Sequence, residues 1–309
     1  MRFSNSLGAI ALAPALAASI GCSNADPGTG APSDLDSGVL DEGGVGGFDG
    51  SILFDAHLPP GCAPGTQYVY LLDRTGNLYK FDPPTLSMTK VGPLNCGNDA
   101  GIGPFSMAVD RNGQAWVVFD DGKLYKVDTA TAACTPTAYV PNQSGFLTFG
   151  MGFATGGPGS TVDTLYVTQD SLPGGPPLQG LATIDTTTLT LTPIGQYDTL
   201  AGSEAELTGT GDGRLYGIFE ANPFTVAEID KATAKIVSQA PQPAVLRQAL
   251  SSNMAFAFWG GDFYMFVGTI STELYHYQPA IGTTTLERTY STMMIGGGVS
   301  TCAPIEPPK

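Results

Sequence analysis

The stretch Ala115–Asp128, AWVVFDDGKLYKVD, contains a short cassette that recurs along the chain. Leu124–Asp128 reads LYKVD, and related cassettes are LYKFD at 78–82, LATID at 181–185, VAEID at 226–230 and LYHYQ at 274–278. Successive cassettes begin 46, 57, 45 and 48 residues apart. A period near 45 residues, carried by β-type segments, is typical of a protein built from repeated small sheets.

Composition agrees with an all-β chain and excludes one large class of partner. The 309 residues are 42% hydrophobic and include 41 Gly and 24 Pro, which suits many short strands joined by tight turns. The net charge is −15, and Lys and Arg do not cluster. Because phosphate binding needs clustered cations, we expect no nucleic-acid partner.

Each repeat after the first predicts four strands separated by turn signals. In the repeat around the opening stretch, Asn112-Gly113 and Asp121-Gly122 mark the hairpin turns. The strands expected there are 105–110, 115–120, 123–128 and 134–140. Those of the later repeats are 147–154, 165–169, 180–186 and 188–194; then 205–210, 215–220, 225–229 and 234–239; then 254–259, 263–267, 273–278 and 283–290.

The first strand of each repeat alternates small with large residues. Gly150 and Gly152 fall between Phe149, Met151 and Phe153, and the first strands at 105–109 and 254–258 show the same alternation. Period-two alternation excludes a helix. The innermost strands of a β-propeller crowd around its axis and need small side chains, so the pattern predicts this fold with large residues wedged between blades.

A structural turn follows four of the cassettes. Each cassette Asp is followed three residues later by Thr, as in the pair Asp128 and Thr131. The Asp carboxylate can accept backbone N–H groups two residues on and thereby close a tight turn. We therefore interpret these acids as turn residues, not as catalytic groups.

The number of strands predicts how the ring closes. The first repeat, beginning at 68–73, has three strands, and the chain ends with a lone inner-type strand at 293–300. If that strand completes the first blade, the result is a closed five-bladed propeller without an exposed inner edge; additional strands within 48–58 would make six blades. Closure places Cys62 beside Cys302 and predicts a disulfide there, and Cys96–Cys134 follows by exclusion.

The N-terminal segment predicts export. Residues 1–22 have Arg2 followed by an apolar run that is too short to span a membrane comfortably. The run ends Ser19-Ile20-Gly21-Cys22, which resembles the lipobox of bacterial lipoproteins, although Ser19 stands where that family prefers Leu. The resemblance implies lipidation of Cys22 and an outer-membrane or cell-surface protein; soluble periplasmic or secreted protein is the alternative.

Residues 23–60 predict a disordered tether. They contain seven acids and no Lys or Arg, with abundant Gly, Ser and Pro. Such a segment cannot bury enough apolar surface to offset its ordering entropy. We therefore expect a single folded domain at 61–309, monomeric and held to a membrane only through a lipid anchor.

The chain resembles five-bladed β-propellers, and among them the uncharacterised propeller-like lipoproteins of Gram-negative surfaces. The resemblance spans about Cys62 to Pro304 and depends on the cassettes, the Asp-x-x-Thr turns, FWGGDFY at 258–264 and the terminal GVSTC. It implies a fold and a cellular address but no chemistry, because such folds host lectins, scaffolds, hydrolases and lyases.

The acidic side chains give weak candidate sites. Asp73, Asp120, Asp170 and Glu220 end the second strand of successive blades and would ring one face. They suggest either a Ca²⁺ or cationic-ligand site or, as we favour, a set of turn acids. With two His in the chain, His57 and His276, and no CxxC, neither a zinc site nor a catalytic triad is supported.

Two functions from different classes remain open. The first is a non-enzymatic binding or scaffold protein that recognises a protein or glycan, with Trp259, Asp262, Glu204, Glu206 and Asp120 as candidate ligand contacts. Trp259 would stack on a ligand if exposed and would be a blade wedge if buried. The alternative is an exported glycan hydrolase or lyase that uses paired channel carboxylates, for which Glu206 with Asp120 is the candidate pair. A deep cleft with convergent carboxylates would favour the enzyme, and a mouth without them would favour binding.

Overall fold

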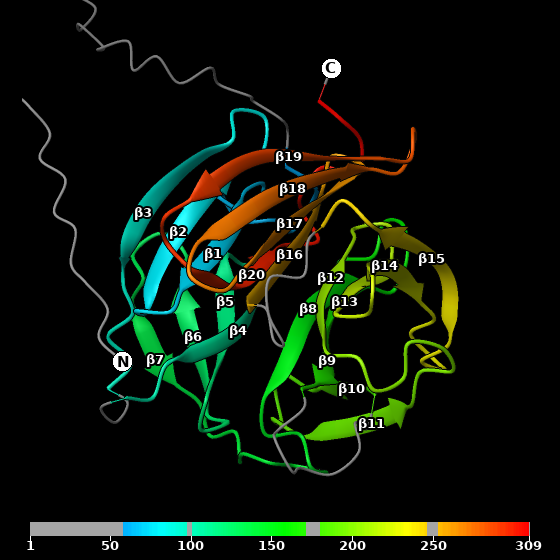
Figure 1. Cartoon of the computed structure of the whole chain (residues 1–309). Coiled ribbons are helices and arrows are strands. Elements are labelled where there is room, and N and C mark those ends of the chain that lie inside the picture. Colours follow the sequence, from blue (N-terminus) through cyan, green and yellow to red (C-terminus); the bar gives the residue numbers. More distant parts are fainter. Residues whose placement is uncertain (1–57, 98–100, 171–179, 246–252, 309) are drawn as a thin grey trace, which may run out of the picture. The chain divides into compact units, whose positions relative to one another are not determined.

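The computed structural model describes residues 58–97, 101–170, 180–245 and 253–308. The expected signal segment, Cys22 and the tether as far as residue 57 lie outside these ranges. The described residues are all-β, with twenty strands in five four-stranded antiparallel sheets (Figure 1). No described segment forms a helix long and apolar enough to cross a membrane.

Each sheet is one blade of a propeller, and four blades are continuous in sequence. Blade 2 contains β4 (Pro104–Val109), β5 (Gln114–Phe119), β6 (Leu124–Asp128) and β7 (Cys134–Pro136). Blade 3 contains β8 (Phe149–Thr155), β9 (Asp163–Gln169), β10 (Leu181–Ile184) and β11 (Leu191–Gly195). Blade 4 contains β12 (Ala205–Gly209), β13 (Leu215–Phe219), β14 (Phe224–Ile229) and β15 (Ile236–Gln242). Blade 5 contains β16 (Asn253–Trp259), β17 (Asp262–Gly268), β18 (Thr272–Gln278) and β19 (Thr283–Tyr290).

Blade 1 is shared between the two ends of the folded chain. The last strand, β20 (Met294–Val299), pairs antiparallel with β1 (Val69–Asp73), which is followed by β2 (Asn77–Asp82) and β3 (Ser87–Pro93). The register joins Val69 to Val299 and Leu71 to Gly297. The predicted closure of the ring by the terminal strand is therefore confirmed, with five blades in the described residues.

Both predicted disulfides are present. Cys62 is bonded to Cys302 across a sequence separation of 240 residues, and Cys96 is bonded to Cys134 across 38. In the chain-entropy model, a crosslink closing so long a loop as the first one stabilises the folded state by roughly 5 kcal/mol. The longer crosslink thus fastens the two chain ends that complete blade 1.

The hydrophobic core is divided among the five contacts between neighbouring blades. The contact between blades 2 and 3, for example, buries Val118 against Phe149 and Leu165. Similar clusters occupy the other four contacts. The large residues of the inner strands fill these clusters, as their alternation predicts, because every second side chain of a strand points to the same face.

Glycines on the inner strands let neighbouring blades approach backbone to backbone. A Cβ on Gly150 would collide with the carbonyl oxygen of Ala205 and lie 3.0 Å from Cα of Glu206. A Cβ on Gly298 would lie 3.0 Å from Cα of Ala108. These positions require glycine for space, which explains the small residues seen in the sequence.

The Asp-x-x-Thr segments form the expected turns. The carboxylate of Asp128 accepts hydrogen bonds from the backbone N–H groups of Ala130 and Thr131 at 3.0 and 2.8 Å. Asp185 and Asp230 repeat this arrangement. The residue after each Thr has a positive φ of 52 to 60°, and these residues are Leu86, Ala132, Leu189 and Ala234. Sequence reasoning did not anticipate this left-handed position, because glycine usually occupies it.

Candidate ligand-binding site

The residues after β20 cross the axial end of the ring. We call residues 301–308 the C-terminal strap. The hydroxyl of Thr301 donates to Asp163 at the start of β9 in blade 3 (2.8 Å), and the backbone N–H of Gly260 in blade 5 donates to the carbonyl of Pro304 (2.7 Å). The Cys62–Cys302 disulfide ties the strap to the segment that enters blade 1. The strap is therefore held by several blades at once.

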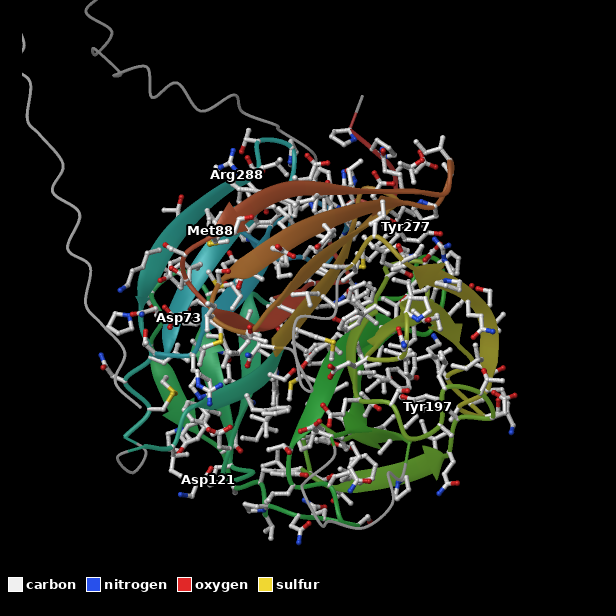
Figure 2. All side chains as sticks on the ribbon, viewed as in Figure 1. Asp73, Met88, Asp121, Tyr197, Tyr277 and Arg288 are labelled. Atoms are coloured by element: carbon white, nitrogen blue, oxygen red, sulfur yellow. A yellow bond between two sulfur atoms is a disulfide. The ribbon has the colours of Figure 1, made fainter. Side chains whose placement is uncertain are left out.

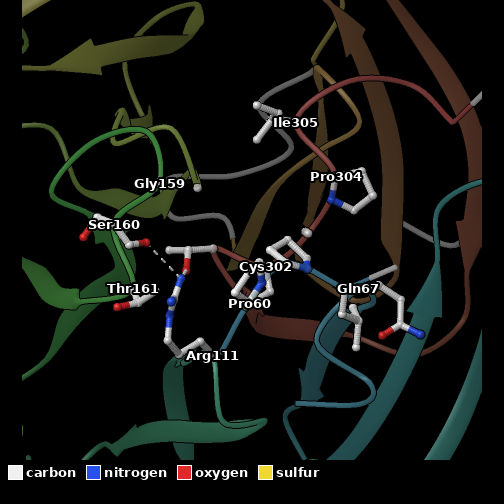
Figure 3. Close-up of a pocket in the computed structure, with 14 residues that line it drawn as sticks. Pro60, Gln67, Arg111, Gly159, Ser160, Thr161, Cys302, Pro304 and Ile305 are labelled. Atoms are coloured by element: carbon white, nitrogen blue, oxygen red, sulfur yellow. Dashed lines mark hydrogen bonds between the residues drawn. The ribbon is translucent and has the colours of Figure 1, made fainter. Parts of the chain in front are cut away.

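A pocket of about 450 Å³ lies beside the strap (Figure 3). Its wall comes from both ends of the folded chain and from the turns that join the first two strands of blades 2, 3 and 4. The lining residues are Leu58, Pro59, Pro60, Gln67, Arg111, Gly159, Ser160, Thr161, Gly211, Thr301, Cys302, Ala303, Pro304 and Ile305. A volume of this size is in the range of sites for small organic ligands.

Arg111 is the one charged residue among the described residues that line the pocket. It follows Asp110 in the turn between β4 and β5, where the Asp110 carboxylate accepts the backbone N–H groups of Asn112 and Gln114 at 2.8 and 3.1 Å. The same turn has Gly113 at φ +73°. This closed turn projects Arg111 toward the strap, and Figure 3 shows its side chain rising between Thr161 and Pro60.

One edge of the Arg111 guanidinium is engaged by the protein. Its Nε lies 3.4 Å from Oδ1 of Asp163, and its Nη2 donates to the carbonyl of Ser160 (3.4 Å) and to the hydroxyl of Thr301 (3.5 Å). The side chains of Arg111 and Asp163 are only 11% and 6% exposed. Burial raises the pKa of Asp163 above its usual value, and the hydrogen bond from Thr301 and the charge of Arg111 counteract that rise.

The other edge of the guanidinium is unused. Within the described part of the chain, Nη1 of Arg111 is buried and has no hydrogen-bond partner, and the side-chain oxygen of Gln67 in the same pocket is also buried without one. A Cβ on Gly61 would lie 3.6 Å from Nη1, so the absence of a side chain there leaves space beside it. Nε of Arg111 also lacks a hydrogen-bond partner, apart from its ion pair with Asp163. Buried polar groups are almost always satisfied, so these atoms leave bonding capacity unused in residues that line the pocket.

Trp259 lies behind this pocket and does not line it. The residue is 8% exposed, and its Nε1–H donates to the backbone carbonyl of Gln67 at 2.7 Å. Trp259 also packs in the cluster between blades 5 and 1. In this position it supports the wall segment that carries Gln67, and it offers no exposed face for stacking.

Glu206 is buried inside the ring. It lies on β12, the inner strand of blade 4, and accepts a 2.7 Å hydrogen bond from the hydroxyl of Ser106 on β4 of blade 2. Burial raises the pKa of Glu206 well above its usual value; the Ser106 hydroxyl and the backbone N–H of Met151 lower it, and the charge of Asp170 raises it further. This hydrogen bond joins blades 2 and 4, which are not neighbours in the ring.

The remaining candidate acids belong to three different blades: Asp120 to blade 2, Glu204 to blade 4 and Asp262 to blade 5. Asp120 is exposed and accepts the backbone N–H of Gly103 at 3.2 Å. Asp262 lies 2.9 Å from Nε2 of His276, and Glu287 lies 3.6 Å from Nδ1 of the same ring. Glu204 precedes β12 and is partly buried.

The four acids expected around one face occupy equivalent turns. The backbone N–H of Asp120, Asp170 and Glu220 each donates to a carbonyl at or near the start of its blade's inner strand. Asp73 (Figure 2) accepts bonds from Thr75, Asn77 and Tyr79, and these bonds outweigh burial and lower its pKa. Within the described ranges, no three His, Cys, Asp or Glu side chains are grouped so as to hold a metal ion.

Sequence reasoning missed both unsatisfied groups of the pocket. Arg111 is one of only 13 basic residues. It follows Asp110 directly in the sequence, and its guanidinium lies beside the carboxylate of Asp163 in the folded protein. A lone cation in a turn of an acidic chain was the available signal. Gln67 carried no signal, because its role depends on the strap, which lies more than 230 residues away in sequence.

Comparison with known proteins gives structural neighbours only. No family model and no curated protein sequence matches the chain.

A chain from the crystal structure of the mitotic checkpoint complex aligns over 76% of this chain and 66% of its own, with 14% identity and a TM-score of 0.38. The extracellular domain of a putative hybrid two-component system, BT4673 from B. thetaiotaomicron, aligns over 74% and 29%, with 14% identity and a TM-score of 0.39. A second structure of BT4673, described as a putative one-component system, aligns over 72% and 28%, with 13% identity and a TM-score of 0.39. The chain thus spans less than a third of the BT4673 chains that it matches.

The disulfides indicate the cellular compartment in which the protein folds. Two disulfides crosslink the β-propeller. Disulfides form and persist outside the reducing cytosol, so their presence indicates an exported protein.

Proposed function

We propose that this protein is an exported, non-enzymatic binding protein whose ligand enters the pocket beside the C-terminal strap. The observation that carries the proposal is the pocket wall, because none of the described residues that line it is Asp or Glu. Glycan hydrolysis typically needs two carboxyl groups about 5 to 10 Å apart, flanking the bond that breaks. The wall instead combines aliphatic and small residues with one arginine, which is the make-up of a recognition site.

The proposal also covers the arrangement of the domains and the cellular location of the protein. The propeller at 61–309 is the recognition domain, monomeric, on the acidic tether at 23–60 behind the signal segment 1–22. Lipidation of Cys22 anchors it to the outer membrane or cell surface. Labelling of cells with palmitate, compared between the native chain and Cys22→Ala, tests the anchor: retention of the label in the variant would contradict it.

A blocked-pocket variant tests the site. Thr161 is an exposed residue of the pocket wall, so Thr161→Trp is expected to fill the pocket without removing a buried contact. The full chain and this variant are screened against arrays of glycans, peptides and small organic ligands. We expect ligands of the native chain to lose at least tenfold in affinity in Thr161→Trp.

The matched control is Thr289→Trp, which places the same side chain on the exposed outer strand β19. It is expected to bind as the native chain does. Ligands that bind all three proteins equally would contradict the proposed site, and turnover of an array glycan by the native chain would contradict the non-enzymatic assignment.

A further inference from the structure

The strap pocket combines an unsatisfied cation with an aliphatic wall. Nη1 and Nε of Arg111 are both buried without a hydrogen-bond partner, although Nε lies 3.4 Å from the Asp163 carboxylate and Nη2 donates to Ser160 and Thr301. An unpaired donor of a charged group is costly to bury, more so than a neutral one. The protein therefore fixes the orientation of the guanidinium beside the pocket and leaves Nη1 without a protein partner.

The rest of the wall selects the body of the ligand. Pro60, Ala303, Pro304 and Ile305 contribute aliphatic surface, and none of the described lining residues is aromatic. A sugar ring is usually recognised by stacking on an aromatic face, and the nearby Trp259 is buried behind the wall. The lining thus favours an aliphatic ligand body over a sugar.

From these observations we propose that the pocket binds aliphatic carboxylates, with the carboxylate on Nη1 of Arg111 and the hydrocarbon body along Pro60 and Ile305. The inference deepens the proposed binding function and depends on it. A carboxylate suits the site because a charge-assisted N–H···O bond is about twice as strong as a neutral one. The side-chain oxygen of Gln67 adds an acceptor for a ligand that also carries a hydroxyl or N–H group.

The experiment is a calorimetric titration of the full chain with octanoate, hexanoate, octan-1-ol and octylamine as probes. Octanoate is expected to bind at least tenfold more tightly than octan-1-ol and octylamine. It is also expected to bind more tightly than hexanoate, by about fourfold for each added methylene that becomes buried.

The variants isolate the guanidinium. Arg111→Gln is expected to lower octanoate affinity tenfold or more and to leave octan-1-ol affinity unchanged, whereas Arg111→Lys keeps part of the preference. The control Arg74→Gln removes an exposed arginine at the opposite end of β1 and is expected to bind octanoate as the native chain does. Arg111→Gln leaves the buried Asp163 without its cation and can therefore prevent folding. The double variant Arg111→Gln/Asp163→Asn removes both charges of the ion pair and is the second test of the guanidinium.

The outcomes separate this inference from the proposed function. Equal affinity for octanoate and octan-1-ol, or an unchanged preference in the folded Arg111 variants, would overturn carboxylate recognition and leave the pocket as a binding site. Array ligands that are blocked by Thr161→Trp but not displaced by octanoate would also overturn the inference while supporting the function. Failure of octanoate to bind at millimolar concentration would overturn it as well.

Discussion

At the scale of single residues, the structure separates acids that close turns from acids that are buried. Asp128, Asp185 and Asp230 accept backbone N–H groups at the surface, as their spacing predicted. Glu206 is different, because it is 5% exposed and has a hydroxyl as its side-chain partner. Glu206 was a candidate channel carboxylate from the sequence, but no sequence pattern identifies its partner Ser106, which is 100 residues away.

The burial of Glu206 predicts a pH-dependent stability. The folded-state pKa is raised above the unfolded value near 4.5, mainly by desolvation, so the folded protein holds a proton that the unfolded chain releases. The stability due to Glu206 is therefore fully present below pH 4.5 and is lost as pH rises through the folded-state pKa. Glu206→Gln, which stays neutral, should match the native unfolding free energy at pH 4 and exceed it by more than about 1 kcal/mol at pH 8, since each pKa unit corresponds to about 1.4 kcal/mol.

Denaturant unfolding at pH 4, 6 and 8 measures this difference. Glu306→Gln, which neutralises an exposed carboxyl, is the matched control variant. Parallel pH profiles for the native chain and Glu206→Gln would contradict the raised pKa.

At the scale of strands and turns, the repeat made most of the fold predictable. The bounds of β5, β16 and β19 agree within one residue with those expected, because alternation and turn residues recur at each equivalent place. The left-handed residues Leu86, Ala132, Leu189 and Ala234 were not predictable, because neighbouring backbone bonds impose that conformation on residues that do not prefer it.

The close approach of inner strands predicts a large effect from one methyl group. In Gly150→Ala, the new Cβ would collide with the carbonyl of Ala205 between blades 3 and 4. We expect a loss of about 1 to 3 kcal/mol in unfolding free energy, as for overpacked cores. In the control Gly156→Ala, the nearest atom to the new Cβ is Oγ of Ser160 at 3.7 Å, and we expect a change within about 0.5 kcal/mol.

Chemical denaturation of both glycine variants provides the measurement. If Gly150→Ala unfolded at the same denaturant concentration as Gly156→Ala, the inner strands of blades 3 and 4 would not pack as closely as described.

At the scale of the whole folded domain, ring closure was predictable and the pocket was not. The count of strands left β20 as the missing member of blade 1, and the same reasoning paired Cys62 with Cys302. The pocket depends instead on where the strap lies after β20, and its wall joins residues as distant as Leu58 and Ile305. No local pattern encodes such a wall, because its geometry exists only after the ring has closed.

The closed ring is the central claim, because the strap and its pocket follow from the pairing of β20 with β1. Native-state hydrogen exchange of the hydrogen-bonded amides in Gly296–Val299 tests it most directly, with β17 of blade 5 as the internal reference. If the ring is closed, β20 exchanges only through global unfolding, with the same opening free energy as β17. Exchange of β20 at an opening free energy near zero, as for a fraying chain end, would contradict the closed ring.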